Sequence, residues 1–371
     1  MEKDLKKIKI ALVHDFLVSF GGAERVLEVM SEMFPEAPIY TLLHDREKMH
    51  GKFENKVIYT SFLQKFPNFL RKRYRWIISF MPTAIEIFDL REFDLVISSS
   101  GAWSKGIVTK LSTTHIAYLH SPMRFVWDCN NSYLSNKKRN FFVRMFVSYL
   151  RIWDKQAAER PDHLIANSCY TQKRVAKYYR RNSQVIYPPV EALAKNIQRS
   201  ENKKRKYFIT VSRLSEYKNI KKVVEAFNEL KLPLIVVGAG KQEKYLRNMA
   251  GDNVRIVGWQ SDEKIKDYLN EARAFVFPAV DDFGIAPVEA MLQGVPVIAL
   301  RAGGSVEYVE EGKTGEFFEE ASSKDIQKAI KKFITQEKNY KQGDIIKQAK
   351  RFSKERFQRE LTDFLCGHIN E

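Results

Sequence analysis

Short runs of β-branched and other apolar residues alternate along this chain with longer segments of helical period. Buried parallel strands produce the first pattern, and helices that cover a sheet produce the second. Residues 23–33 illustrate the helical pattern, since Val26, Val29, Met30 and Met33 fall on one face. The alternation predicts an α/β fold in which helices connect parallel strands.

The predicted strands fall into two series. Residues 8–13, 57–60, 95–98, 115–119, 163–166 and 184–187 form the first series, and residues 207–211, 234–237, 254–257, 274–277 and 297–300 form the second. Between them, residues 195–206 are polar and charged, as is typical of a linker. We therefore expect two doubly wound domains, over residues 1–194 and 195–352, and a separate helical segment over residues 353–371. Phe357, Leu361 and Phe364 recur in this segment at helical spacing and need a surface to cover.

Composition and charge narrow the classes of partner. The formal net charge of +17 over 371 residues favours a polyanionic partner, which is a nucleic acid, an anionic membrane surface or a phosphorylated substrate. The three cysteines are widely spaced, so we expect them to be reduced. The N-terminal residues lack the apolar region of a signal peptide, and no apolar run reaches the roughly 18 residues that span a bilayer. These features predict a cytoplasmic protein whose contact with a membrane is at most peripheral.

Two loops that follow predicted strands carry groups suited to phosphate. Gly21 and Gly22 lie between the first strand and its helix, where backbone amides can approach a phosphate at the positive helix end. The alternative is a tight turn that needs positive φ. Arg213 and Lys218 follow the strand that ends at residue 211, at the sheet edge where α/β proteins bind ligands. Together they suit a diphosphate, and the alternative is a pair of solvated cations.

The stretch over residues 278–299 carries two carboxylates, Asp281 in a loop and Glu289 in the helix that follows. Glu289 is placed to accept hydrogen bonds from the vicinal hydroxyls of a ribose, and the alternative is a capping role at the helix N-terminus. Trp259, next to Gly258 at the end of another strand, lies where a turn can hold a nucleobase, although a core or interface aromatic is the favoured alternative. A second glycine-rich helix entrance is formed by Gly303, Gly304 and Ser305.

The order of these motifs resembles the retaining GT-B glycosyltransferases of family four, which have two Rossmann-like domains facing each other across a cleft. The resemblance covers nearly the whole chain. It is carried by Gly21-Gly22, Tyr118-Leu119-His120-Ser121-Pro122, Ser212-Arg213-Leu214 with Lys218-Asn219, the run from Asp281 to Glu289, and Gly303-Gly304-Ser305.

The resemblance implies a role for each motif residue. Arg213 and Lys218 hold the donor diphosphate, Glu289 holds the ribose, Gly22 approaches the phosphates, and His120 lies beside the donor sugar through its side chain or backbone. The first acidic residue of such pairs is usually Glu and contacts the sugar, whereas here it is Asp281, one methylene shorter. The expected catalytic residues are His120, Asp281, Arg213 and Lys218. The expected donor-binding residues are Gly21, Gly22, Arg213, Lys218, Gly258, Trp259, Asp281, Phe283, Gly284, Ile285, Glu289, Gly303, Gly304 and Ser305.

The same resemblance implies a retaining hexosyltransferase without a cofactor or an essential metal, and a C-terminal helix that crosses back to the first domain. Positive side chains then stabilise the leaving nucleotide diphosphate, and front-face transfer is favoured, with the leaving phosphate assisting deprotonation of the acceptor. The run from Asp281 to Glu289 is most similar to mannosyltransferases of surface-polysaccharide and lipopolysaccharide O-antigen assembly. GDP-mannose is therefore the favoured donor, ahead of UDP-sugars, and the acceptor is a saccharide or a lipid-linked saccharide.

Two segments mix cations with aromatic residues, over residues 65–75 and 137–151. Helices of this kind dock onto anionic membranes, so we expect peripheral contact with the inner face of the cytoplasmic membrane. The alternative is a core-facing helix with a solvated basic side. The charge and the interleaved aromatic residues also support a nucleic-acid-binding protein, which leaves the loop motifs unexplained. A closer alternative is a GT-B-like enzyme of another kind, such as a sugar-nucleotide epimerase or a phosphorylase.

Overall fold

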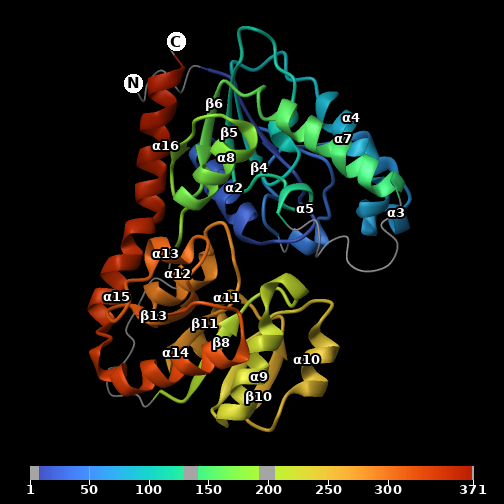
Figure 1. The fold of residues 1–371 in the computed structure, drawn as a ribbon. Coiled ribbons are helices and arrows are strands. Elements are labelled where there is room, and N and C mark those ends of the chain that lie inside the picture. The colour runs from blue at the N-terminus through green and yellow to red at the C-terminus, as the bar shows by residue number, and fades with distance from the viewer. Residues whose placement is uncertain (1–7, 50, 129–140, 192–204, 370–371) are drawn as a thin grey trace. The chain divides into compact units, whose positions relative to one another are not determined.

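The computed structural model describes residues 8–49, 51–128, 141–191 and 205–369 (Figure 1). Contacts divide the chain into two compact units. The N-terminal unit consists of residues 1–189 together with residues 355–371, and the C-terminal unit consists of residues 190–354.

The N-terminal unit is built on a seven-stranded parallel sheet. Its strands are β1 (Ile10–His14), β2 (Ile39–Thr41), β3 (Ile58–Thr60), β4 (Leu95–Ser100), β5 (Thr114–Leu119), β6 (His163–Ala166) and β7 (Gln184–Val185). Their order in the sheet is β3-β2-β1-β4-β5-β6-β7. The order reverses between β1 and β4, and the carboxyl ends of these two strands are where doubly wound sheets bind ligands.

Helices cover both faces of this sheet, which is why β1 reads as an unbroken apolar run. Ile10 and Leu12 enter one core cluster, whereas Ala11 and Val13 enter another on the opposite face. The main helices are α2 (Gly22–Met33), α3 (Asn68–Lys72), α4 (Met81–Glu86), α5 (Arg124–Trp127), α7 (Phe141–Ala157), α8 (Cys169–Tyr179) and α16 (Lys354–His368).

The C-terminal helix α16 packs on the sheet of the N-terminal unit (Figure 1). Phe357 and Leu361 are fully buried in the same cluster as Leu12 and Val26. The ring of Phe357 meets that of Tyr118 on β5 edge to face, with centroids 5.8 Å apart. The helical spacing of its apolar residues thus covers a surface built by distant parts of the chain.

The C-terminal unit is a six-stranded parallel sheet in the order β10-β9-β8-β11-β12-β13. The strands are β8 (Tyr207–Val211), β9 (Leu234–Val237), β10 (Val254–Gly258), β11 (Ala272–Phe277), β12 (Val297–Leu300) and β13 (Gly315–Phe318). The helices are α9 (Ile220–Leu230), α10 (Glu243–Met249), α11 (Asp262–Glu271), α12 (Ile285–Leu292), α13 (Ser305–Tyr308), α14 (Ser323–Gln336) and α15 (Gln342–Ala349). Here the order reverses between β8 and β11.

The predicted α/β fold with two Rossmann-like parallel sheets is confirmed. Two strands were missed, which are β2 with three residues and β13, which begins at Gly315 and contains the charged residue Glu316. The segment over residues 65–75 is not one helix. It is broken into α3 and flanking 3₁₀ turns at Phe62–Lys65 and Tyr74–Phe80. Of the second basic segment, residues 137–140 lie outside the described residues and the rest belongs to α7.

Candidate active site

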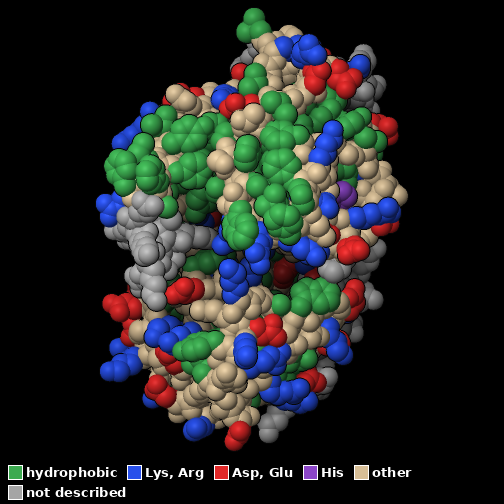
Figure 2. All heavy atoms as spheres, turned by 90° about the vertical axis from the view of Figure 1, so that its right-hand side faces the viewer, with side chains coloured by type: hydrophobic (Ala, Val, Ile, Leu, Met, Phe, Trp, Pro, Cys, Tyr) green, Lys and Arg blue, Asp and Glu red, His purple; other side chains and the backbone are tan. Residues whose placement is uncertain are grey.

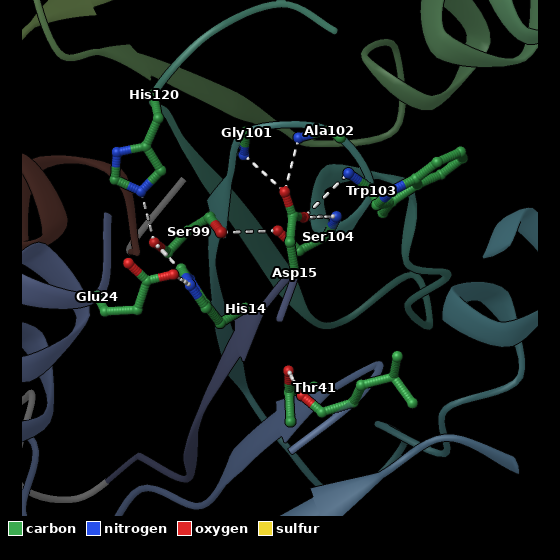
Figure 3. Close-up of polar contacts among 11 residues, drawn as sticks. His14, Asp15, Glu24, Thr41, Ser99, Gly101, Ala102, Trp103, Ser104 and His120 are labelled. Carbon is green, nitrogen blue, oxygen red and sulfur yellow. Dashed lines mark hydrogen bonds and ion pairs between the residues drawn. The ribbon is translucent and has the colours of Figure 1, made fainter. Parts of the chain in front are cut away.

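The carboxyl ends of β1, β4 and β5 bring polar side chains together in the N-terminal unit (Figure 3). His14 ends β1 and Asp15 follows it, Ser99 lies on β4, and His120 comes directly after β5. Because these three strands are neighbours in a parallel sheet, residues far apart in sequence meet at one edge.

Asp15 is an anchor for the loop after β4. Its Oδ2 accepts hydrogen bonds from the backbone N–H groups of Gly101 and Ala102, at 2.9 and 2.7 Å. Its Oδ1 accepts from those of Trp103 and Ser104, at 2.9 and 2.7 Å. The carboxylate is 8% exposed, so four backbone donors take the place of its hydration. Asp15 therefore fixes the loop that continues from the strand carrying Ser99.

Ser99 joins two histidines. Its Oγ lies 3.0 Å from Nδ1 of His14 and 2.7 Å from Nε2 of His120. On the other side of His14, Nε2 lies 3.5 Å from Oε1 of Glu24, in the first turn of α2. His14 and Ser99 are buried.

His120 is neutral at physiological pH. Burial, reinforced by the neighbouring His14 ring, lowers the pKa of His120 to about 3. Its backbone is already engaged, since its N–H donates to Ser100 O and its carbonyl accepts from Nδ2 of Asn167. The side chain is thus the part of His120 best placed to meet a ligand.

Gly21 and Gly22 open α2 without positive φ. Gly21 is the N-cap with φ −158°, an extended conformation, and neither glycine has a left-handed backbone. The alternative of a tight turn that requires positive φ is therefore wrong. A Cβ at Gly21 would lie 3.2 Å from Oε2 of Glu24, so a phosphate at this helix end would share the site with a carboxylate.

In the C-terminal unit, an ion pair joins the two loops at the reversal point. Lys218 lies in a 3₁₀ turn after β8, Asp281 lies in the loop after β11, and Lys218 Nζ is 2.5 Å from Oδ2 of Asp281. The two side chains are 13% and 18% exposed. Arg213, in the same loop as Lys218, is exposed. The structure therefore brings Lys218 and Asp281 together and leaves the Arg213 guanidinium open to solvent on the same loop.

The loop after β12 packs directly on the backbone of the loop after β11. Gly303 has φ +70°, and a Cβ there would lie 2.3 Å from Asp281 O. Gly304 donates its N–H to the same carbonyl at 2.9 Å, and a Cβ on it would lie 2.4 Å from the Phe283 backbone. Ser305 is fully buried, with Oγ 2.5 Å from Leu300 O. These three residues fit the two loops together, and the Ser305 hydroxyl faces its own loop.

The remaining predicted donor-binding residues of this loop and helix differ in how deeply they are buried. Phe283 is 2% exposed, and its ring packs against the rings of Tyr308 and Phe352. Gly284, with φ +94°, precedes Ile285, the first residue of α12. Glu289 lies one turn further along and is 9% exposed.

The capping alternative for Glu289 is wrong, and of the core or interface position considered for Trp259, the core position is wrong. Gly284 is the N-cap of α12 and the first turn has no acidic residue, so Glu289 does not cap the helix. Trp259, which follows Gly258 at φ +74°, is 62% exposed and is not a core aromatic.

Asp15, Ser99 and Glu24 had no role predicted from the sequence. A signal was present, because the polar pair His14-Asp15 ends an otherwise apolar strand, and Ser98 to Ser100 end another. Their pairing depends on which strands are neighbours, and that is not readable from a single chain.

Two further findings concern the described part of the chain. Within residues 8–49, 51–128, 141–191 and 205–369, no group of three or more His, Cys, Asp or Glu could hold a metal ion. In the same ranges, no helix is long and apolar enough to cross a membrane.

Comparisons with known proteins agree with this geometry. Residues 20–192 match the family described as Glycosyltransferase Family 4, and residues 194–352 match Glycosyl transferases group 1. The α-1,3/1,6-mannosyltransferase ALG2 of Dictyostelium discoideum is 23% identical, over 93% of this chain and 94% of its own length. The O-antigen chain mannosyltransferase RfbU of Salmonella typhimurium is 27% identical, over 40% of this chain and 45% of its own. The crystal structure of HepE from Anabaena with UDP and glucose aligns with a TM-score of 0.70 at 20% identity, covering 97% of this chain and 99% of HepE.

Two doubly wound units, each with polar loops at its reversal point, define the class of GT-B glycosyltransferases. With one family match on each half, the chain belongs to the family 4 glycosyltransferases.

Proposed function

We propose that this enzyme transfers mannose from GDP-mannose to a saccharide or lipid-linked saccharide acceptor, with retention of configuration and without a metal or other cofactor. The observation that carries the proposal is the cationic loop after β8, where Lys218 pairs with the carboxylate of Asp281 and Arg213 is exposed on the same loop. The names of two relatives support mannose as the sugar.

The arrangement suits departure of a nucleoside diphosphate. As the bond between the sugar and the phosphate breaks, negative charge grows on the diphosphate, and the two cations of this loop would stabilise it more in the transition state than in the ground state. Asp281 holds the Lys218 ammonium in place beforehand, which reduces the cost of orienting it. The buried Glu289 would accept hydrogen bonds from the ribose hydroxyls.

The nucleotide is the first property to test. The melting temperature of the purified wild-type protein would be measured with GDP, UDP, dTDP or ADP. The same measurements would be made on the Arg213→Ala and Glu289→Ala variants. Lys313→Ala serves as the control, because Lys313 pairs with Glu310 on the surface of the same unit. We expect GDP to raise the melting temperature of the wild type and of the control only. UDP is the main competitor, since HepE binds it, and a response to no nucleotide would refute the donor site.

Retention can be tested without knowing the acceptor. In water alone, slow hydrolysis of GDP-α-mannose would release α-mannose first if configuration is retained, and proton NMR resolves this anomer before it equilibrates. Release of β-mannose would refute retention. Equal rates with and without EDTA are expected if no metal takes part.

We further propose that one face of the N-terminal unit rests on an anionic membrane. Phe66 and Leu70 of the first basic segment pack against the core cluster in which Leu150 of α7 is buried, so both segments lie on the same side of the sheet (Figure 1). Their outward positions carry exposed apolar residues, which are Phe69, Trp76, Phe80, Phe141, Phe142, Val143, Met145, Tyr149 and Ile152. We call these nine residues the apolar face.

The charge around the apolar face favours a lipid surface. Residues 62–80 and 141–153 contain no acidic residue, and Lys65, Lys72, Arg73, Arg75 and Arg144 are exposed among them. Figure 2 shows hydrophobic side chains gathered on this side, with Lys and Arg nearby. Aliphatic residues such as Val143 and Ile152 gain from burial in lipid but not from contact with phosphate backbones, so the pattern favours a membrane over nucleic acid.

Vesicle co-sedimentation tests this surface. Phosphatidylcholine vesicles with and without phosphatidylglycerol would be compared for the wild type, Trp76→Ser with Phe142→Ser, and a control Tyr245→Ser on α10. We expect the wild type and the control to bind only vesicles that contain phosphatidylglycerol. The double variant should not bind. Equal binding by all three proteins would refute this surface, as would tight, salt-dependent binding to arbitrary RNA in place of vesicles.

A further inference from the structure

Four side chains form a hydrogen-bonded series that ends at His120 (Figure 3). Glu24 on α2 faces Nε2 of His14, Nδ1 of His14 faces Ser99, and Ser99 faces Nε2 of His120. His14 and Ser99 are 2% and 0% exposed, so solvent does not compete for these contacts.

The hydroxyl of Ser99 restricts where protons can be. It carries one hydrogen and lies between two ring nitrogens, so it donates to one and accepts from the other. Two arrangements satisfy it when both rings are neutral. Either His14 donates from Nδ1 and His120 accepts at Nε2, or His14 accepts at Nδ1 and His120 donates from Nε2.

Glu24 distinguishes the two arrangements. A carboxylate only accepts, so Nε2 of His14, 3.5 Å from Oε1, is stabilised in its protonated form. A neutral His14 ring then has a bare Nδ1, which accepts from the Ser99 hydroxyl. The Ser99 oxygen in turn accepts from Nε2–H of His120, and the proton of His120 is absent from its Nδ1.

The other nitrogen of His120 has no hydrogen-bond partner among the residues that the structure describes. In the second arrangement this Nδ1 carries a lone pair. It can accept a hydrogen bond from a hydroxyl group, and it cannot donate to a carbonyl or phosphate oxygen.

We propose that Glu24, His14 and Ser99 are positioning residues that hold His120 in its Nε2–H tautomer, so that its Nδ1 accepts a hydrogen bond from a hydroxyl of the sugar substrate. The sugar partner rests on the proposed function, whereas the tautomer does not. Glu24 would thus act on the substrate through three intervening side chains, by deciding the direction of every hydrogen bond in between.

The tautomer can be observed directly. Full-length protein labelled with ¹⁵N and ¹³C in its histidine rings would be sedimented at pH 8 without substrate and studied by solid-state NMR, which distinguishes protonated from bare ring nitrogens. The His120 signals would be assigned from their loss in His120→Asn. We expect the wild type to show only the Nε2–H form of His120. The Nδ1–H form in the wild type would overturn the proposal.

Variants show whether the series sets the tautomer. Ser99→Ala breaks the series and Glu24→Gln replaces the acceptor with an amide that both donates and accepts, so both tautomers should appear at His120. Ser99→Thr keeps a hydroxyl and should keep the single form. Glu28→Gln is the matched control, because Glu28 lies one turn further along α2 and pairs with Lys52. An unchanged single form in Ser99→Ala and Glu24→Gln would overturn the proposal.

A kinetic readout then connects the tautomer to the sugar. With GDP-mannose, kcat should fall about tenfold in Glu24→Gln and Ser99→Ala and stay near the wild-type value in Ser99→Thr and Glu28→Gln, which corresponds to one hydrogen bond made to the reacting sugar. GDP binding should be unchanged in Ser99→Ala, Ser99→Thr and Glu28→Gln, whereas Glu24→Gln removes a negative charge from the helix end where the donor phosphate is expected. An altered tautomer with unchanged kcat would overturn the role toward the sugar and leave the tautomer assignment standing, whereas failure of the proposed donor would not move the NMR result.

Discussion

Replacing Asp15 by Asn should lower the free energy of unfolding of the N-terminal unit substantially, although the amide has nearly the same shape as the carboxylate. The carboxylate accepts four backbone N–H groups with two oxygens, at 2.7 to 2.9 Å. An Asn side chain has one carbonyl oxygen for two of these donors, and its NH₂ group faces the other two.

The magnitude follows from which donors lose their acceptor. Leaving a buried donor unsatisfied costs about 1–3 kcal/mol, so two of them cost about 2–6 kcal/mol. Trp103 and Ser104 are buried, whereas Gly101 and Ala102 are partly exposed. The amide oxygen should therefore turn toward the buried pair and leave the other pair to water, which brings the expected loss to about 2–3 kcal/mol. Asp15→Ala abandons all four donors and should cost more.

Urea unfolding followed by tryptophan fluorescence measures this loss, because four of the five tryptophans, including Trp103, lie in the N-terminal unit. The matched control is Asp162→Asn, since Asp162 accepts one backbone N–H, from His115 at 2.7 Å. Its amide oxygen can keep that bond, so about 1 kcal/mol or less should be lost. A loss in Asp15→Asn no larger than in the control would refute the reasoning that this carboxylate holds the loop.

Three further predictions concern other parts of the molecule. Burial lowers the pKa of His115 to about 3, so between about pH 6.5 and 3 the unfolded chain binds a proton that the folded chain does not, and stability falls as the pH falls. Between pH 7 and pH 5, the free energy of unfolding measured in urea should fall by about 2 kcal/mol from this cause, and His115→Gln should lack this fall. An equal pH dependence in both proteins would contradict the prediction. Gly304→Ala should destabilise the C-terminal unit by about 1–3 kcal/mol and abolish stabilisation by GDP, because the new Cβ meets the Phe283 backbone at 2.4 Å. In Gly343→Ala, where no atom lies within 4 Å, thermal unfolding and GDP response should stay at wild-type levels or improve slightly. Leu361→Ala on α16 should cost the N-terminal unit about 2–5 kcal/mol in the same urea assay, since this fully buried side chain fills its core; a loss confined to the C-terminal unit would show that α16 belongs elsewhere.

The sequence by itself determined the fold class, most strands and the position of the polar loops that follow the strands. Apolar runs such as Leu234–Val237 are buried on both faces of a parallel sheet. Burial on both faces makes the strand a continuous apolar run, which can be identified without knowing which strands lie beside it. The positions of Arg213, Lys218 and Asp281 were predicted in the same way, because a loop that follows the carboxyl end of an apolar strand lies at an edge of the sheet.

Tertiary structure decided what each of those residues touches. Strand order places β1 beside β4 and β5, and only that order brings Ser99 between His14 and His120 and puts four amides on Asp15. Packing buried the Phe283 ring and turned the Ser305 hydroxyl toward its own loop, although both residues stand in a motif that suggests ligand contact. The physical reason is the same in each case. Periodicity is local and is written along the chain, whereas a hydrogen-bond partner or a core neighbour is chosen by contacts between separate segments that only the folded chain brings together.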